Sequence, residues 1–132
     1  MKNQGNKQIT YARIAGYESA IAAATQADVQ VIAAEGELGE REITELGDEM
    51  VSLACASRCN LVLDLSAVHH VDYRQVRALS ARARLLRSAG GDLKLCGLSG
   101  YLEAIFRASG LYSEFDIHEG ASEASASFAI ER

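Results

Sequence analysis

The sequence predicts a single α/β domain with a mostly parallel sheet of four or five strands, an antiparallel strand at one edge, and four or five flanking helices. Three observations predict this class. Short apolar runs alternate with segments whose apolar residues recur at helical spacing, which is typical of strand-helix-strand crossovers. The run Leu61–Leu65 is almost continuously apolar, as in a parallel strand covered on both faces. The 132 residues, 48% of them hydrophobic, suffice for the core of one domain.

Residues 1–28 are predicted to form an extension ahead of the main domain, which spans residues 29–132. The first eight residues are polar and favour a tail. Residues 9–14 alternate in polarity, which favours a short strand and makes them the candidate for the antiparallel edge. The alanine-rich stretch Glu18–Ala27 fits a helix or an ordered connection, because alanine favours helix but supplies little area to bury.

The main domain is predicted to begin with a strand and a helix. Val29–Ala34 is apolar and partly β-branched, and Gly36 and Gly39 bracket a turn after it. Residues 40–57 follow with the spacing of an amphipathic helix. The apolar stripe of this helix consists of Ile43, Leu46, Met50 and Leu53. Its opposite side carries Glu42, Glu45, Asp48 and Glu49.

The strand Leu61–Leu65 is predicted to lie at the sheet centre, and a loop, Ser66–Val71, is predicted to follow it. Asp72 is a candidate N-cap, and Gln75 completes the pattern of a capping box, so a helix is expected from there to about Ser88. The apolar face of this helix consists of Val76, Leu79, Ala83 and Leu86.

The alternation of strands and helices continues to the end of the chain. Gly90-Gly91 ends the second helix, and Leu93–Cys96 is the next strand. Ser99 can cap a third helix that Gly110 closes. The last predicted elements are a short edge strand, Phe115–His118, and a terminal helix, Ala121–Ile130.

Composition disfavours several classes of function. A net charge of -5 and a pI of about 5.2 oppose binding to phosphate backbones, so no nucleic-acid partner is expected. No run approaches the roughly 18 apolar residues of a membrane span, and no apolar segment follows the polar start, so we expect a cytoplasmic protein without membrane insertion. Three cysteines form an odd set that fits a reducing compartment.

The motifs of catalysis and of cofactor binding are missing from the sequence. It contains no Gly-x-Ser-x-Gly elbow, no phosphate-binding loop and no Gly-x-Gly-x-x-Gly. His69 and His70, together with Cys55 and Cys59, match no standard zinc spacing. We therefore expect no metal, no cofactor and no enzymatic activity.

Four local strings occur in a characteristic order. They are Glu35-Gly36-Glu37-Leu38, Leu61-Val62-Leu63-Asp64-Leu65-Ser66-Ala67-Val68 followed by Val71-Asp72, Gly90-Gly91-Asp92-Leu93-Lys94-Leu95-Cys96-Gly97-Leu98-Ser99, and Ser109-Gly110-Leu111-Tyr112. Together they resemble the STAS domain, the fold of anti-sigma-factor antagonists, stressosome subunits and the cytoplasmic tails of sulfate transporters. The resemblance covers roughly residues 29–132 and implies a non-catalytic bacterial regulatory domain that binds another protein.

The resemblance fails at the family's phosphorylation site. In antagonists that phosphorylation switches, the helix start reads Asp-Ser-Ser-Gly, and the first serine accepts phosphate from a kinase-type anti-sigma factor. Here Asp72 is retained, but Tyr73, Arg74 and Gln75 replace the next three residues, and Gly39 replaces an aspartate after Gly-Glu-Leu. A tyrosine hydroxyl lies too far out to reproduce a phosphoserine at a helix start. Serine phosphorylation switching at position 73 is therefore expected to be lost.

The predicted partner-binding surface runs from the loop into the second helix. Tyrosine and arginine are enriched at binding hot spots, and residues 74–88 hold five of the chain's 13 basic residues, which suits an acidic partner. A purely structural explanation is also open for these residues. Asp72 can serve only as a helix cap, and the arginines can pair with the acidic helix or be solvated. The predicted residues are Ser66, His69, His70, Asp72, Tyr73, Arg74, Arg77 and Arg84.

The identity of the partner stays open at this point. The resemblance implies an anti-sigma factor, a kinase-like regulator or a transporter component. The alternatives are a stressosome-like scaffold or homodimer, in which basic and acidic helices meet between copies, and a domain that senses a nucleotide or a lipid. An accessory role beside a transporter is a further alternative.

Overall fold

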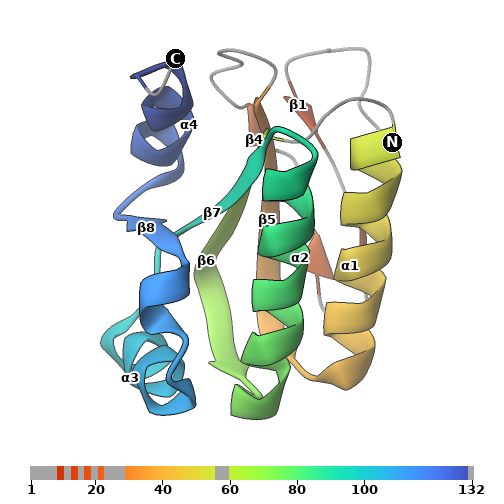
Figure 1. Ribbon diagram of the computed structural model, residues 1–132. Coiled ribbons are helices and arrows are strands. Elements are labelled where there is room, and N and C mark those ends of the chain that lie inside the picture. Colours follow the sequence, from red (N-terminus) through yellow and green to blue (C-terminus); the bar gives the residue numbers. More distant parts are fainter. Residues whose placement is uncertain are drawn as a thin grey trace.

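The computed structural model describes the backbone of residues 9–10, 13–14, 17–18, 21–22, 29–55 and 60–130, and the side chains of residues 29–55 and 60–128. Its centre is a parallel sheet with strand order β5-β6-β7-β8 (Figure 1). The strands are β5 (Val29–Leu38), β6 (Asn60–Val71), β7 (Asp92–Cys96) and β8 (Asp116–His118). The helices are α1 (Glu40–Cys55), α2 (Val76–Ser88), α3 (Gly100–Ser109) and α4 (Ala121–Ile130). The predicted α/β class is confirmed.

The antiparallel pairing that the structure describes lies before β5. There β1 (Ile9–Thr10) pairs with β4 (Ile21–Ala22), and β2 (Arg13–Ile14) pairs with β3 (Tyr17–Glu18). These two ladders are separate from the four-stranded sheet, and no antiparallel edge strand joins that sheet within the described residues. The described residues of the alanine-rich stretch Glu18–Ala27 belong to strands β3 and β4, so a helix is wrong for them. The rest of the predicted tail and connection lies outside the described residues, and the division at residue 29 stays a prediction.

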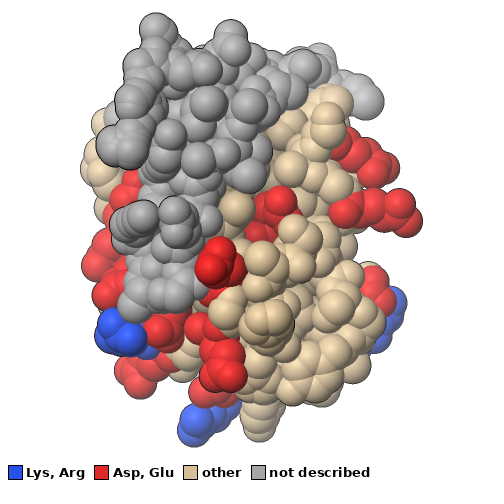
Figure 2. All heavy atoms as spheres, turned by 180° about the vertical axis from the view of Figure 1, so that it is seen from behind, with Lys and Arg blue, Asp and Glu red and all other residues tan. Residues whose placement is uncertain are grey.

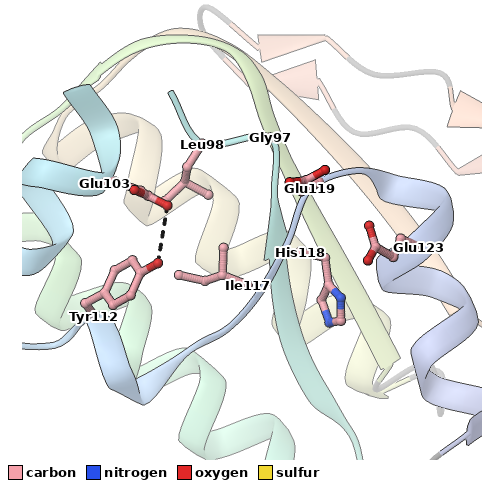
Figure 3. A pocket seen from close by; sticks show the side chains of 8 residues that line it. All are labelled: Gly97, Leu98, Glu103, Tyr112, Ile117, His118, Glu119 and Glu123. Atoms are coloured by element: carbon pink, nitrogen blue, oxygen red, sulfur yellow. Dashed lines mark hydrogen bonds between the residues drawn. The ribbon is translucent and has the colours of Figure 1, made fainter. Parts of the chain in front are cut away.

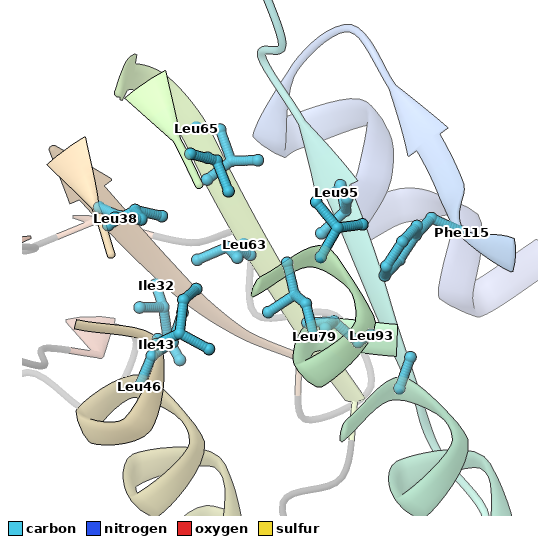
Figure 4. Close-up of a cluster of buried hydrophobic side chains, with 14 of the residues drawn as sticks. Ile32, Leu38, Ile43, Leu46, Leu63, Leu65, Leu79, Leu93, Leu95 and Phe115 are labelled. Carbon is cyan, nitrogen blue, oxygen red and sulfur yellow. The ribbon is translucent and has the colours of Figure 1, made fainter. Parts of the chain in front are cut away.

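The main core lies between one face of the sheet and helices α1, α2 and α3. Figure 4 shows the part of this core that lies between the sheet and helices α1 and α2. The predicted apolar faces are confirmed, because all four residues of the α2 face and three of the four in the α1 stripe are buried, and Leu53 is half-buried. A fully buried aliphatic side chain contributes about 1.5–3 kcal/mol, so these faces hold both helices on the sheet. The opposite sheet face packs against α4 through Val29, Val31, Val62, Cys96, Ala124 and Phe128.

Strands β5 and β6 are longer than the sequence predicts. The predicted turn at Gly36 and the predicted loop Ser66–Val71 are both wrong, because these residues continue the two strands as a paired ladder. The register shifts on either side of Glu35 and Gly36, where Gly36 has a φ of 86°. Such bulges interrupt the alternation that identifies a strand in sequence. The predicted partner-binding surface therefore begins on a paired strand.

The helix caps agree with the sequence except at α2. The Ser99 hydroxyl accepts a hydrogen bond from Leu102 N–H at 3.1 Å, and Gly110 ends α3 with a φ of 81°. Asp72, however, caps a 3-10 turn, η2 (Tyr73–Gln75), and α2 follows that turn. The predicted capping box is wrong, because the Asp72 N–H donates to the Leu38 carbonyl at 3.1 Å instead of to a glutamine side chain.

Candidate functional site

The predicted partner-binding residues before α2 lie where β6 leaves the sheet. Turn η2 follows β6 directly, and α3 lies beside η2 at the lower end of the molecule in Figure 1. Carboxyl ends of parallel strands and the loops after them are the usual place for ligands in α/β folds. The site is therefore built from the end of β6 and the adjoining turn η2 together with α3, which is more than 20 residues further along the chain.

A shallow groove of about 390 Å³ separates the end of β6 and η2 from α3. Its lining residues are His70, Val71, Asp72, Tyr73, Tyr101, Ala104, Ile105 and Ala108. Two tyrosines of this lining are exposed to solvent, Tyr73 by 57% and Tyr101 by 56%. They are two of the four exposed large apolar side chains among the described residues. An apolar hollow edged by exposed aromatic rings is typical of a protein interface.

His70 connects the two sides of the groove. Its Nδ1 atom shares a hydrogen bond of 2.7 Å with the Tyr101 hydroxyl, and the two ring centroids lie 5.7 Å apart. In the β5-β6 ladder His70 is opposite Glu37. This bond ties the end of β6 to the first turn of α3 and orients the Tyr101 ring.

Asp72 and Arg74 form an ion pair at the start of η2. The Asp72 carboxylate accepts the Arg74 backbone N–H at 3.0 Å, its Nε at 3.3 Å and its Nη2 at 3.2 Å. The side-chain hydrogen bonds from Arg74 lower the pKa of Asp72, so the carboxyl group is ionised at neutral pH. The next two backbone N–H groups, of Gln75 and Val76, donate to the carbonyls of Asp72 and Tyr73.

The other predicted site residues lie apart from the groove lining. Ser66 and His69 are exposed on β6, and the Ser66 N–H donates to Asp64 Oδ1 at 3.0 Å. Arg77 is exposed on α2, one helical turn after Tyr73. Arg84 lies near the other end of α2, where its Nη1 is 3.1 Å from Glu114 Oε1. Partner binding by these residues stays a prediction.

The arginines of α2 do not pair with the acidic side of α1 in the part of the chain that the structure describes. Their ion pairs go elsewhere, to Glu114 for Arg84 and to Asp92 for Arg87. The Arg82 guanidinium lies against Gly47 of α1, where a side chain would collide with it. Figure 2 shows the face opposite to α1 and α2, where acidic side chains predominate among the charged ones. The arginine-rich helix therefore lies on the opposite side of the molecule from this acidic face.

A second cavity of about 490 Å³, which the sequence did not reveal, lies between α3, β8 and α4 (Figure 3). Its lining residues are Gly97, Leu98, Glu103, Tyr112, Ile117, His118, Glu119 and Glu123. The Tyr112 hydroxyl donates to Glu103 Oε2 at 3.3 Å. The glutamates make the cavity acidic, and no signal in the sequence could indicate it because the lining residues come from separate elements.

Asp116, His118 and Ser127 form a cluster beside this cavity. His118 Nε2 is 3.2 Å from Asp116 Oδ1 and 3.4 Å from Ser127 Oγ. A Ser-His-Asp relay needs the carboxylate and the hydroxyl on different ring nitrogens, whereas here both contact Nε2. The Ser127 hydroxyl also donates to the Ala124 carbonyl at 2.7 Å. The cluster therefore lacks the geometry of a catalytic triad.

The cysteines and histidines give no metal centre within the described residues. Cys59, one of the four residues considered for zinc, lies outside them. Burial, reinforced by the neighbouring Asp64, raises the pKa of the Cys96 thiol to about 12, so this cysteine stays protonated as an apolar side chain. Of the helices that the structure describes, none is long and apolar enough to cross a membrane.

Comparisons with known proteins agree with this fold. The family model of the STAS domain matches residues 6–124, so the chain belongs to the STAS domain family. BtrV of Bordetella bronchiseptica, a proposed anti-sigma factor antagonist, is 26% identical over 94 residues, which are 71% of this chain and 81% of that protein. The resemblance inferred from the four strings is confirmed.

Solved structures share this fold, among them those of TM1081 and SpoIIAA. TM1081 of Thermotoga maritima, also a proposed anti-sigma factor antagonist, aligns with a TM-score of 0.70 and 17% identity over 96% of this chain and 97% of that one. The unphosphorylated form of the anti-sigma factor antagonist SpoIIAA, a Bacillus protein, aligns with a TM-score of 0.62 and 12% identity, over 94% of this chain and 99% of that one. At these identities the likeness extends to the fold alone.

Proposed function

We propose that this STAS domain is an anti-sigma-factor antagonist that acts in the cytoplasm by binding a kinase-like anti-sigma factor, without catalysis. The binding site would be the groove face, defined as His70, Asp72, Tyr73, Arg74, Arg77 and Tyr101. The observation that carries the proposal is the pair of exposed tyrosine rings beside an apolar groove. Rings in this position bury a large apolar area on binding and lose little side-chain freedom.

The mechanism would be competition for the anti-sigma factor. The antagonist would bind the same surface of the anti-sigma factor that binds the sigma factor. Its binding would then release the sigma factor by mass action. Support comes from the similarity to BtrV and from the paired β6 end and the His70-Tyr101 bond, which hold the site before binding. A site that is already ordered loses less conformational entropy when it binds.

Replacing Tyr73 with alanine is expected to weaken binding to the anti-sigma factor about tenfold, because a central aromatic contact is lost. The measurement is calorimetric titration of each purified kinase-like anti-sigma factor of the source organism with the wild-type and variant chains. Leu85→Ala is the matched control, since Leu85 is 49% exposed but lies near the far end of α2. Equal affinities for wild type and Tyr73→Ala would contradict the proposed site.

We further propose that serine-type phosphorylation does not regulate this site. The Tyr73 hydroxyl is at the far end of an exposed phenol ring instead of on a serine Cβ, and Asp72 already accepts the Arg74 backbone N–H at the start of η2. The backbone N–H groups of the two following residues are also used within the turn. The backbone N–H groups of residues 74–76 are therefore all used within the turn, so a phosphorylated residue would gain little from the backbone of the helix start.

The test compares the wild type with a variant that restores the family motif, Tyr73→Ser, Arg74→Ser and Gln75→Gly. A kinase-type anti-sigma factor supplied with labelled ATP is expected to leave residue 73 of the wild type unmodified and to label the restored serine. Mass spectrometry of the tryptic peptide locates the phosphate. Label on Tyr73 would overturn this prediction, and an unlabelled restored variant that still binds the kinase would show that the motif alone is insufficient.

A further inference from the structure

We propose that the outer surface of helices α1 and α2 binds a second copy of this chain, with the acidic α1 of each copy against the basic α2 of the other. We define the helix-pair face as Asp48, Val51, Arg82 and Leu85. None of these residues lines the groove, so the inference goes beyond the proposed function and does not depend on it.

Helices α1 and α2 lie side by side on one face of the sheet (Figure 1). Each helix connects two neighbouring parallel strands, so the two helices run in the same direction. They touch where the Arg82 side chain lies against Gly47. This contact places the two residues within about one helical turn of each other in height.

The helix-pair face carries two of the exposed large apolar side chains among the described residues. Val51 is 38% and Leu85 49% exposed. Val51 lies one turn after Gly47, and Leu85 lies one turn after Arg82, so both follow the helix contact in the same direction. Single apolar side chains are common on protein surfaces, but two at similar heights on adjacent helices form a patch that a second copy can cover.

The two helices carry opposite charges of equal size. Helix α1 has five carboxylates and one arginine, a formal net charge of -4, and α2 has four arginines and no carboxylate, a net charge of +4. The ion pairs recorded within the chain leave these signs unchanged, because one lies within α1 and two join α2 to residues outside both helices. Among the described residues, the structure records no ion pair for Asp48 or for Arg82.

These charges select one way of placing two copies face to face. A two-fold axis across the helices would put α1 on α1 and α2 on α2, so that like charges meet. A two-fold axis parallel to the helices puts each α1 on the α2 of the other copy and leaves all heights unchanged. Asp48 of one copy then faces Arg82 of the other, and Val51 lies near Leu85. A different partner would need the same two charged helices in reverse order, which a second copy provides.

The size of this surface favours a reversible dimer. Helices α1 and α2 have 16 and 13 residues, so they are about 24 and 20 Å long, and two helices packed about 8–10 Å apart form a surface roughly 20 Å wide. This is less than the roughly 800 Å² per partner of a typical stable complex. The dimer is therefore expected to dissociate in the micromolar range or above.

The test exchanges the charges of the pair that the two-fold axis creates. Sedimentation velocity of the full chain, up to millimolar concentration, should show a monomer that becomes a dimer, less readily at high salt. Asp48→Arg and Arg82→Glu each place like charges opposite each other twice, so either variant alone should dimerise about tenfold more weakly or worse. An equimolar mixture of the two variants restores both pairs of opposite charge and should dimerise about as well as the wild type. Glu123→Arg is the matched control, on α4 at the opposite face of the sheet.

A second measurement needs only the wild-type chain, because Arg82→Glu also loses the packing against Gly47. In a mixture of isotope-labelled and unlabelled copies, NMR should detect contacts between the Val51 methyl groups of one copy and the Leu85 methyl groups of the other.

Four results would each overturn the inference: a wild type that stays monomeric, a mixture of the two folded variants no tighter than either alone, a Glu123→Arg control as weak as Asp48→Arg, or wild-type contacts at another surface. Leu85→Ala should weaken the dimer but leave anti-sigma-factor binding unchanged, since Leu85 lies outside the groove lining. The dimer and the proposed function therefore fail separately.

Discussion

Replacing Asp116 with alanine is expected to lower the free energy of unfolding by about 3 kcal/mol, because the buried ammonium group of Lys94 loses a carboxylate partner. Lys94 is 0% exposed, and its Nζ atom lies 2.8 Å from Asp116 Oδ2. The same atom lies 4.5 Å from the centre of the Phe128 ring on α4. The expected loss is at the low end for a buried pair, since the Asp116 side chain is 41% exposed. The pair therefore helps to hold β7, β8 and α4 together.

Urea unfolding of the wild type and the Asp116→Ala variant measures this loss, with the slope of the transition unchanged. Asp48→Ala, which removes an exposed carboxylate from α1, is the control and should change stability by less than about 0.5 kcal/mol. The double variant Lys94→Met, Asp116→Ala should recover much of the loss, because it also removes the buried charge. A double variant as unstable as the single one would show that the buried charge is not the cause.

Acid provides an independent measure of the same pair. Burial alone would raise the pKa of Asp116, but hydrogen bonds from Lys94 and His118, together with their charges, outweigh it and hold the pKa below the usual 3.8. A lowered pKa means that the stabilisation is complete above the unfolded value and is lost as the pH falls below it. Between about pH 5 and pH 3 the wild type should lose more stability than Asp116→Ala.

Replacing Gly97 with alanine is expected to cost about 3 kcal/mol, from backbone strain and from a collision. Gly97 has a φ of 77°, a region that residues with a side chain rarely adopt. A Cβ atom there would lie 2.9 Å from Asp64 Oδ1, from Ser66 Cβ and from the Ser66 backbone nitrogen. The added methyl group would therefore displace β6 at the point where the strand extends toward the groove.

Gly110→Ala separates the two contributions, because Gly110 has a similar φ of 81° but open space around its Cα. We expect it to cost about 1 kcal/mol, the strain alone. Thermal unfolding of both variants gives the comparison, and NMR shifts of His70 and Tyr101 report whether the groove moves. Equal losses in the two variants would remove the packing argument at Gly97.

Local patterns in the sequence were enough to predict most elements of this fold. The stripe in α1 and the face of α2 lie within single helices, so spacing alone reveals which side is buried. The caps at Ser99 and Gly110 likewise depend on residues within one or two turns. Asp72 and Tyr73 could be singled out for the same reason, since the motif they belong to is contiguous.

Tertiary structure decided what those patterns could not. The extension of β5 and β6 depends on a bulge that only the pairing of the two strands reveals. The groove depends on Tyr101, which is 31 residues from His70 in the sequence. The two residues meet only because the chain returns through α2 and β7 before α3 begins. Arg84 differs from Arg77 because Glu114, 30 residues away, folds back against it. Contacts between distant segments leave no periodic trace in a single sequence, so the α/β domain could be predicted from residues 29–132 but the groove could not.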